Sequence, residues 1–407
     1  MPVERIETLV IGGGQAGLTM SHRLKQRGLK HLVLERHRIA ERWRSERWDG
    51  LKFQFPNWSV RLPDLSFPHS DPDAFASTGD IVAFIEAYVD FVAPPIRCGV
   101  AVTRLRRNGA SGFVAETPEG AIEADNVVVA TGPYQRPLMP DLLRDEVSIF
   151  QVHASRYLNP DQLPPGAVLV VGAGASGAQI TEELYRAGRR VFLSVGRHSR
   201  LPRRYRGRDL IWWLSELGID RTTVEERGPS RLLPVISGAY GGRTIDFRRF
   251  AADGVTLLGR VTAARDGMLD IAPDIAESLA QGDAVYTTFL DTVDAHVERQ
   301  GLRFPQEPEA RAMLADPPCV TKPVRQLDLG AEGIAAVIWA TGYGVDFGWI
   351  DLPVLDARGE PAHRRGITEV PGLYFLGLQW LSKMKSSFLS GVGDDAAMLA
   401  DHIAARR

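Results

Sequence analysis

The stretch from Ile6 to Gly17 reads Ile-Glu-Thr-Leu-Val-Ile-Gly-Gly-Gly-Gln-Ala-Gly, a short, mostly apolar run that ends in a glycine-rich turn. A helical pattern follows, and a second apolar run over residues 31–34 ends at Glu35. This order of strand, glycine turn, helix and strand is that of a βαβ unit, in which two parallel strands are joined by a right-handed crossover. The stretch therefore predicts an α/β fold that binds a dinucleotide.

The spacing of the glycines supports this prediction. Gly12, Gly14 and Gly17 fit the pattern G-x-G-x-x-G, which provides a tight turn, a close backbone approach to a pyrophosphate, and close packing of helix on strand. The free amides at the start of the helix would then face the phosphates. Glu35 stands where an acidic residue can accept hydrogen bonds from a ribose 2′-hydroxyl. The expected contacts from this unit are Gly12, Gly14, Gln15, Ala16, Gly17, Glu35 and Arg36.

A second copy of the pattern begins at Ala167. In the first copy the second strand ends at Glu35, but in this copy no acid stands there and the strand leads to Arg197. An arginine can pair with a 2′-phosphate, which a carboxylate would repel. This difference favours NADPH over NADH at the second unit. Its expected contacts are Gly172, Gly174, Ser176, Gly177, Arg197 and His198, with Arg200, Arg203 and Arg204 either extending a positive patch or lying in a solvated loop.

Two later apolar runs end in the same three residues. One strand closes with Ala130-Thr131-Gly132, and another, much later, with Ala340-Thr341-Gly342. Continuous apolar runs of this length suit strands that are buried on both faces of a sheet. Thr131, Gly132, Ala340, Thr341 and Gly342 are accordingly expected to contact a cofactor.

The expected organisation is two Rossmann-like domains, the second inserted into the first. Turn-rich residues before Ala167 and the Pro317-Pro318 pair mark the boundaries. The outer domain is expected to span residues 1–160 and 320–407, and the inserted domain 161–319. Within the latter, residues 205–319 form a possible substrate cap that begins with an amphipathic helix near Trp212 and Trp213.

Composition excludes several classes of protein. The 407 residues carry 48 basic and 50 acidic side chains, and this balance argues against nucleic-acid binding through bulk positive charge. The two cysteines argue against a zinc site or a disulfide scaffold, and no metal site is expected. No apolar stretch has the length of a membrane span, and the first residues do not resemble a signal peptide, so we expect a cytoplasmic protein.

Three further stretches resemble the class B flavin-containing monooxygenases. They are the late Ala-Thr-Gly-Tyr that ends at Tyr343; the segment with Arg42, Trp43, Trp48 and Asn57, which is similar to the one that passes the flavin ring; and residues 150–157, similar to a degenerate copy of the family fingerprint. His153 and Tyr157 keep the fingerprint spacing, whereas Ile149 replaces its glycine. Leu378 also replaces an aspartate of related reductases, which leaves the flavin ribityl contact unassigned.

The resemblance implies that the outer domain binds FAD and the inserted domain NADPH. Reduced FAD would form a C4a-hydroperoxide with O2 and oxygenate a small organic substrate. Because Tyr157 stands where the Baeyer–Villiger fingerprint has tryptophan, N-, S- or C-hydroxylation is favoured over Baeyer–Villiger insertion. An NADPH-dependent flavin reductase and a non-enzymatic nucleotide sensor remain alternatives, and a homodimer is possible.

The resemblance also suggests roles for individual side chains. Asn57 is the candidate catalytic residue near the reactive edge of the flavin, with stabilisation of a Pro-Asn turn as the alternative. Arg42, Trp43 and Trp48 are expected beside the flavin, although the tryptophans also suit a packed core. For His153 a structural role is favoured over proton transfer.

Overall fold

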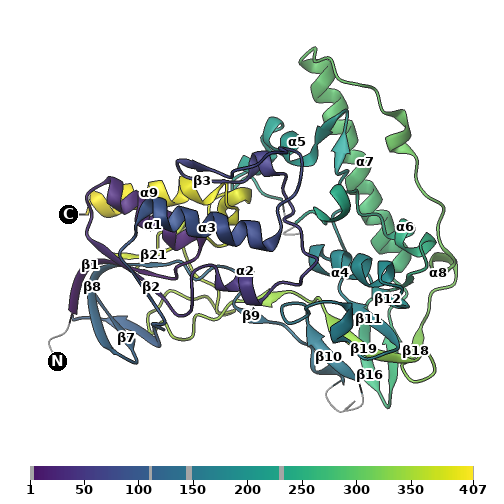
Figure 1. Ribbon diagram of the computed structural model, residues 1–407, viewed down its shortest axis with the longest axis horizontal. Coiled ribbons are helices and arrows are strands. Elements are labelled where there is room, and N and C mark those ends of the chain that lie inside the picture. The colour runs from purple at the N-terminus through teal and green to yellow at the C-terminus, as the bar shows by residue number, and fades with distance from the viewer. Residues whose placement is uncertain (1–3, 110–111, 144–148, 229–232, 407) are drawn as a thin grey trace.

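The computed structural model describes residues 4–109, 112–143, 149–228 and 233–406, and shows two α/β domains side by side. Both chain ends lie in the first domain, and the middle of the chain builds the second (Figure 1). The prediction of two Rossmann-like folds, one inserted into the other, is confirmed because the strands of the second sheet lie between two strands of the first along the chain.

The first sheet has the order β5-β2-β1-β8-β7-β6, with β21 paired to the end of β8. Strands β5, β2, β1, β8 and β21 run parallel, whereas β7 is antiparallel to both β6 and β8. The strands are β1 (Glu4–Ile11), β2 (His31–Glu35), β5 (Ile96–Cys98), β6 (Arg104–Arg107), β7 (Phe113–Thr117), β8 (Gly120–Val129) and β21 (Leu373–Phe375). The helices of this domain are α1 (Gln15–Gln26), α2 (Glu41–Ser45), α3 (Thr78–Val92) and α9 (Val392–Ala404).

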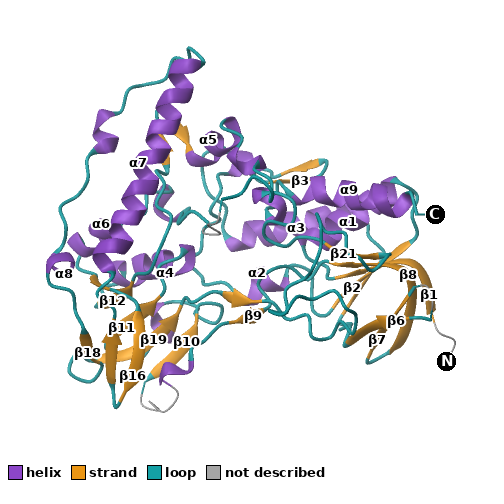
Figure 2. Ribbon diagram, turned by 180° about the vertical axis from the view of Figure 1, so that it is seen from behind, coloured by secondary structure: helices purple, strands orange, loops and turns teal. Residues whose placement is uncertain are grey.

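The second sheet is entirely parallel, in the order β10-β19-β11-β12-β15. Its strands are β10 (Phe150–His153), β11 (Ala167–Val171), β12 (Val191–Ser194), β15 (Thr256–Leu258) and β19 (Ile334–Trp339). Its helices are α4 (Ala175–Arg186), α5 (Leu210–Glu216), α6 (Phe247–Ala252), α7 (Ile275–Arg299) and α8 (Pro318–Thr321), and α7 stands out from the domain (Figure 2). All five residues of β11 are buried, as expected for a central parallel strand.

The strand pairing differs from the boundaries expected at residues 160 and 320. β10 and β19 both belong to the second sheet, where β19 lies between β10 and β11, although both were expected in the outer domain. The apolar runs of these strands fit either sheet, so their partners are decided by tertiary pairing rather than by local sequence. The second domain therefore includes residues 150–153 and 334–339.

The segment expected as a cap contributes regular structure to the second domain. It supplies β15 and most of a three-stranded antiparallel sheet, and its expected amphipathic helix is α5, capped by Asp209. Trp213 of α5 is fully buried, and its indole donates to the carbonyl of Tyr205 at 2.8 Å, which is core packing. The remaining strands are β3 (Arg61–Leu62), β4 (Leu65–Ser66), β13 (Arg204–Tyr205), β14 (Arg208–Asp209), β16 (Val261–Arg265), β17 (Met268–Ile271) and β18 (Gln326–Asp328).

The chain crosses between the two sheets after β8 and again after β19. These crossings pair with each other as the antiparallel strands β9 (Arg136–Pro137) and β20 (Tyr343–Gly344). The Thr341 hydroxyl donates to the carbonyl of Leu138 in the same ribbon. The two connections therefore form one two-stranded link.

Candidate active site

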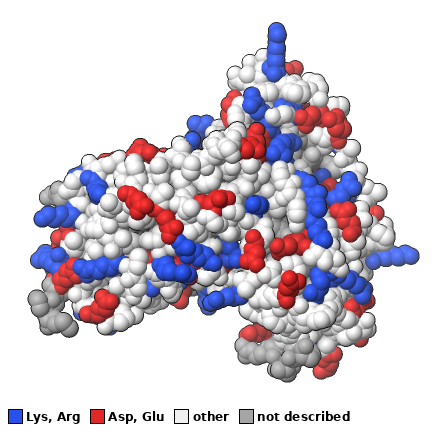
Figure 3. Space-filling view, viewed as in Figure 1, with Lys and Arg blue, Asp and Glu red and all other residues white. Residues whose placement is uncertain are grey.

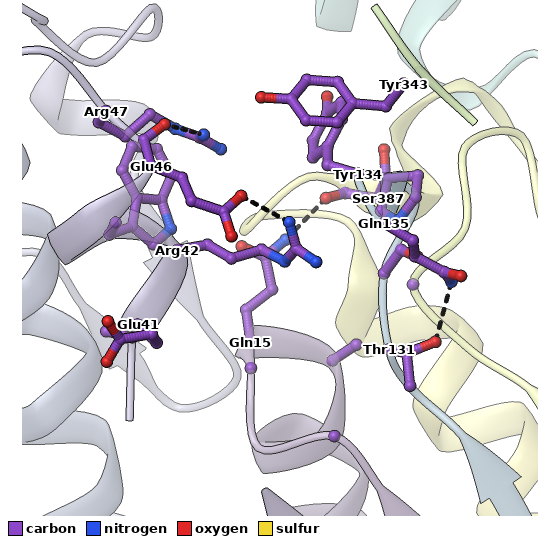
Figure 4. A pocket seen from close by; sticks show the side chains of 18 of the residues that line it. Gln15, Glu41, Arg42, Glu46, Arg47, Thr131, Tyr134, Gln135, Tyr343 and Ser387 are labelled. Carbon is purple, nitrogen blue, oxygen red and sulfur yellow. Dashed lines mark hydrogen bonds and ion pairs between the residues drawn. The ribbon is translucent and has the colours of Figure 1, made fainter. Parts of the chain in front are cut away.

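A cavity of about 790 Å³ is lined by residues of both domains. Its lining comes from the first glycine loop, the end of β2, α2 with the segment to Phe55, the loops after β8 and β19, and the second glycine loop. Figure 4 shows Gln15 at the start of α1, Arg42 of α2, and Tyr134 and Tyr343 after β8 and β19 around this cavity. The cavity therefore brings together the two motifs that the sequence analysis identified separately.

The first glycine loop opens onto this cavity. Gly12 has φ +111°, and a Cβ atom there would lie 2.6 Å from the carbonyl oxygen of Ala130. A Cβ at Gly17 would collide with the carbonyl oxygen of Gly12, which explains the close contact of α1 and β1. A Cβ at Gly14, by contrast, would meet no protein atom within 4 Å, and Gly14 lines the cavity. The loop thus has the open space that a pyrophosphate needs.

The start of α1 and the end of β2 complete this side of the cavity. Gln15 and Ala16 line it, and the Gln15 amide donates to the carbonyl of Ser387 at 2.6 Å (Figure 4). The Glu35 carboxylate accepts from the amides of Gly13 and His37 at 2.7 and 2.9 Å, and it also lines the cavity together with Arg36. Its position suits a contact with a ribose hydroxyl.

The second glycine loop repeats this geometry. Gly172 has φ +106°, and its Cβ would lie 2.5 Å from the carbonyl oxygen of Ala340. A Cβ at Gly177 would collide with the Gly172 carbonyl, and a Cβ at Gly174 would meet nothing within 4 Å. Gly174, Ser176 and Ala340 line the cavity, whereas Gly172 and Gly177 lie behind it. A second phosphate-binding loop therefore faces the same cavity as the first.

The end of β12 lies outside the cavity lining. Arg197 is exposed and forms no hydrogen bond or ion pair with the described residues. His198, by contrast, is buried: its ring lies 4.8 Å from that of Phe247, Nδ1 lies 3.1 Å from the carbonyl oxygen of Gly196, and burial lowers its pKa. The structure thus leaves Arg197 open to a ligand and packs His198 against the domain core.

The expected positive patch does not extend beyond Arg197, because two of its arginines are buried in ion pairs. Arg200 pairs with Asp246 and Asp283 at 2.7 and 2.6 Å. Arg203 pairs with Asp209 at 2.9 Å. Neither of the two alternatives, phosphate patch or solvated loop, was correct for these two side chains. The remaining member, Arg204, is exposed and donates to the carbonyls of Gly241 and Gly242 at 3.2 Å.

The segment that begins at α2 supplies charged and aromatic side chains. Arg42 extends across the cavity and donates to Glu46 at 2.6 Å, and burial lowers its pKa (Figure 4). The guanidinium of Arg47 lies 5.2 Å from the Trp43 ring. Trp48 lines the cavity and is otherwise buried in the core of the second domain. Arg42, Trp43 and Trp48 therefore all reach the cavity.

The loops after β8 and β19 face each other. Thr131 and Gly132 line the cavity, where the Gln135 amide donates to Thr131 Oγ1 at 3.0 Å (Figure 4). The rings of Tyr134 and Tyr343 meet edge to face at 5.2 Å. Gly342 also lines the cavity, whereas Thr341 lies outside the lining.

His153 and Tyr157 of the fingerprint contact the loop after β19 and helix α4, respectively. His153 Nε2 lies 3.0 Å from the carbonyl oxygen of Gly342, and burial lowers the pKa of His153. Tyr157 donates to Glu183 of α4 at 2.8 Å, and burial raises the pKa of this carboxyl group. These contacts fit the structural role that was favoured for His153.

Asn57 lies in a buried turn and does not line the cavity. Its Nδ2 donates to the carbonyl of Asp71 at 3.0 Å, and its backbone amide donates to the carbonyl of Ala74. These contacts correspond to the turn-stabilising alternative. The aromatic lining residues Phe53, Phe55 and Phe388 were not predicted, because the first two match no motif and Phe388 is far from them in the chain.

Comparison with known proteins agrees with this geometry. A model of the family described as pyridine nucleotide-disulphide oxidoreductase matches residues 9–215. The chain belongs to this family. An oxidoreductase of Geobacillus kaustophilus described as CzcO-like is 35% identical to it over 404 residues, which is 98% of each chain. A probable indole-3-pyruvate monooxygenase of Arabidopsis thaliana, YUCCA1, is 33% identical over 183 residues, 44% of each chain.

Solved structures share the fold of this oxidoreductase. A flavin-containing monooxygenase from Stenotrophomonas maltophilia aligns with a TM-score of 0.69 at 17% identity over 99% of each chain. An ornithine N-hydroxylase of Kutzneria sp. 744, solved with reduced FAD, NADP+ and L-ornithine, aligns with a TM-score of 0.62 at 16% identity and covers both chains fully. The expected resemblance to flavin-containing monooxygenases is thereby confirmed.

Two further observations concern the described part of the chain. It contains no helix long and apolar enough to cross a membrane. It also contains no group of three or more histidine, cysteine or acidic side chains that could hold a metal ion. On the face shown in Figure 3, basic and acidic side chains are intermixed.

Proposed function

We propose that this oxidoreductase is an FAD-dependent monooxygenase that consumes NADPH and O2 to oxygenate a small organic substrate. The observation that carries the proposal is the pair of glycine loops that open onto one cavity, each with free space at its second glycine. Two dinucleotides bound at these loops would extend into a shared space. This arrangement suits electron transfer from a nicotinamide to a flavin.

The first site is assigned to FAD. The amides of the loop at Gly12 and Gly14 would hold the pyrophosphate at the start of α1, and Glu35 would accept the ribose hydroxyls. Arg42, Trp43 and Trp48 would then bound the part of the cavity that receives the flavin. When bound and reduced, FAD supplies the activation of O2, and the protein orients it and excludes water.

The second site is assigned to NADPH. The loop at Gly174 and Ser176 would hold its pyrophosphate, and the exposed Arg197 would pair with the 2′-phosphate. The NADPH domain would thus run from residue 150 to residue 339 around the second sheet. The strands of the first sheet would form the FAD domain. The contact of His153 with Gly342 would keep the loop after β19 in place beside the nicotinamide.

For the reaction type we favour N-, S- or C-hydroxylation over Baeyer–Villiger insertion. Support comes from the fingerprint, which ends in Tyr157, and from the fold, which is shared with an ornithine N-hydroxylase. An NADPH-dependent flavin reductase is the second candidate, since the same two sites would serve it. Reduction of a disulfide by a thiol pair of this chain has no support, because Cys98 ends β5 of the first sheet, Cys319 lies in α8 of the second domain, and neither lines the cavity.

Rapid-mixing absorbance spectroscopy tests the proposal. The FAD-loaded protein is reduced by NADPH without oxygen and is then mixed with O2. A monooxygenase should show a transient near-ultraviolet absorbance before oxidised FAD returns, and a substrate should incorporate one atom of labelled O2. Direct return to oxidised FAD would favour the reductase. Absence of reduction by NADPH would favour a nucleotide sensor, and a chain that takes up no FAD would contradict the proposal.

A further inference from the structure

Part of the cavity is lined by a continuous series of aromatic rings. Trp43 meets Phe53 at 5.7 Å, Phe53 meets Phe55 at 5.5 Å, and Phe55 meets Phe388 at 5.0 Å, each pair edge to face. All four rings are half-buried and line the cavity. We call these four side chains the aromatic wall.

The aromatic wall lines the same cavity as Glu35 and the start of α1. Glu35 closes the first βαβ unit beside β5, where an adenosine ribose would lie. Phe388 follows Ser387, whose carbonyl accepts from Gln15 at the start of α1, so this ring of the wall lies near the position of the pyrophosphate. Leu233 and Pro234 of the second domain face the same cavity. The wall therefore adjoins the space where the redox-active rings of the two dinucleotides would meet.

The charges beside the aromatic wall are positive on balance. Arg42 and Glu46 neutralise each other as an ion pair of 2.6 Å. Arg47 and Lys52 also line the cavity, and neither forms an ion pair with a carboxylate among the described residues. A positively charged substrate would be repelled here, whereas a neutral or anionic one would not.

A buried arginine of the second domain holds the aromatic wall in place. Arg203 donates to the carbonyl of Gln54 at 2.7 Å, forms two hydrogen bonds to Asp209, and lies 4.5 Å from the ring of Phe75. Gly238 packs directly on the carbonyl oxygen of Phe53, where a Cβ atom would collide. The segment between Phe53 and Phe55 is thus held by two contacts from the second domain, and the rings form a preformed surface.

We infer that the substrate of this enzyme presents an apolar, ring-bearing group without positive charge, and that the aromatic wall binds it. The inference rests on the proposed function, because it places the substrate beside the bound dinucleotides. Edge-to-face contacts with a further ring would continue the series from Trp43 to Phe388. Burial of such a ring and repulsion of an ammonium group together would set the preference for the substrate.

Three probes with one carbon skeleton test the inference: phenylpropionate, phenylpropanol and phenylpropylamine. Each is titrated into the oxidised, FAD-loaded enzyme, and the dissociation constant is read from the change in the flavin absorbance. The acid and the alcohol should bind about tenfold more tightly than the amine. Equal binding of the three, or tighter binding of the amine, would overturn the inference.

Variants locate the binding surface. Phe55→Ala should weaken binding of the acid and the alcohol by about tenfold, because it removes one ring of the wall. Phe55→Leu, which keeps apolar volume, should weaken it less and serves if the alanine variant does not fold. Phe304→Ala is the matched control, since Phe304 packs on Trp212 and Trp213 and does not line the cavity. Equal effects of Phe55→Ala and Phe304→Ala would contradict the assignment.

The two proposals fail in different ways. If the enzyme takes up FAD and is reduced by NADPH but none of the probes changes the flavin spectrum, the inference about the substrate is wrong and the proposed function stands. If no FAD is taken up, the proposed function fails, and the inference fails with it.

Discussion

The first and second βαβ units have closely similar glycine loops and differ at the end of the strand that follows. In both, the first glycine packs on an alanine carbonyl of a neighbouring strand, and the second opens onto the cavity. The strand that follows ends at Glu35 in one unit and leads to the exposed Arg197 in the other. The comparison supports the proposal that the two glycine loops hold phosphates, and that the residue at or after the end of the next strand selects the dinucleotide.

The largest effect should come from filling the open space at either second glycine. Gly14→Leu should abolish FAD binding, and Gly174→Leu should leave FAD bound but abolish reduction by NADPH. Both variants should fold, because a Cβ at either position meets no protein atom within 4 Å. The ratio of flavin to protein absorbance and the anaerobic reduction rate measure the two losses. Loss of the same nucleotide in both variants would show that the two loops are not separate sites.

Reversal of charge at Arg197 should have the next largest effect. Arg197→Glu removes a charge-assisted contact with the 2′-phosphate, so the KM for NADPH should rise on the order of 10- to 100-fold while that for NADH changes little. Steady-state oxidation of both nucleotides measures this. Arg303→Glu, at another exposed arginine, is the control and should change neither value. Equal rises in the KM for NADPH and for NADH would show that Arg197 does not bind the 2′-phosphate.

A smaller effect is expected at the corresponding position of the first unit. Glu35→Ala removes the acceptor for the ribose hydroxyls and should weaken FAD binding by about tenfold. The KM for NADPH of the FAD-loaded variant should remain that of the unchanged enzyme. Titration of the apoprotein with FAD measures the affinity. An unchanged FAD affinity together with a changed KM for NADPH would mean that the first glycine loop binds NADPH rather than FAD.

The smallest effect should be a dependence of the free energy of unfolding on pH, to which histidines of both domains contribute. Burial lowers the pKa of His22 and His31 in the first domain and of His153 and His198 in the second. The unfolded chain binds protons at these positions below its ordinary histidine pKa of 6.5, whereas the folded chain does not. Stability should therefore fall as the pH decreases below that value, by at most about 1.4 kcal/mol per histidine and pH unit.

Denaturant titrations between about pH 7 and pH 5 measure this dependence. His31→Gln and His198→Gln stay neutral throughout, so each should reduce the slope of stability against pH by a similar amount. A slope that neither variant changes would mean that other groups cause the acid destabilisation.

The sequence predicted what local pattern can encode. The glycine spacing predicted both βαβ units, an amphipathic pattern predicted the helix near Trp212 and Trp213, and the two Ala-Thr-Gly ends were expected to contact a cofactor. The sequence did not predict that β10 and β19 pair in the second sheet, because apolar strands find their partners only in the tertiary structure. It also placed Arg200 and Arg203 on a phosphate site or in solvent, since the carboxylates that pair with them are distant or unmarked by any motif.

The paired ribbon of β9 and β20 has a mechanical consequence. Two separate connections between domains could bend independently of each other. Two strands that are hydrogen-bonded to each other must bend together. Any rotation of one domain against the other would have to bend both connections at once. The Gly132 and Gly342 turns, which precede these strands and line the cavity, would then keep their positions relative to each other.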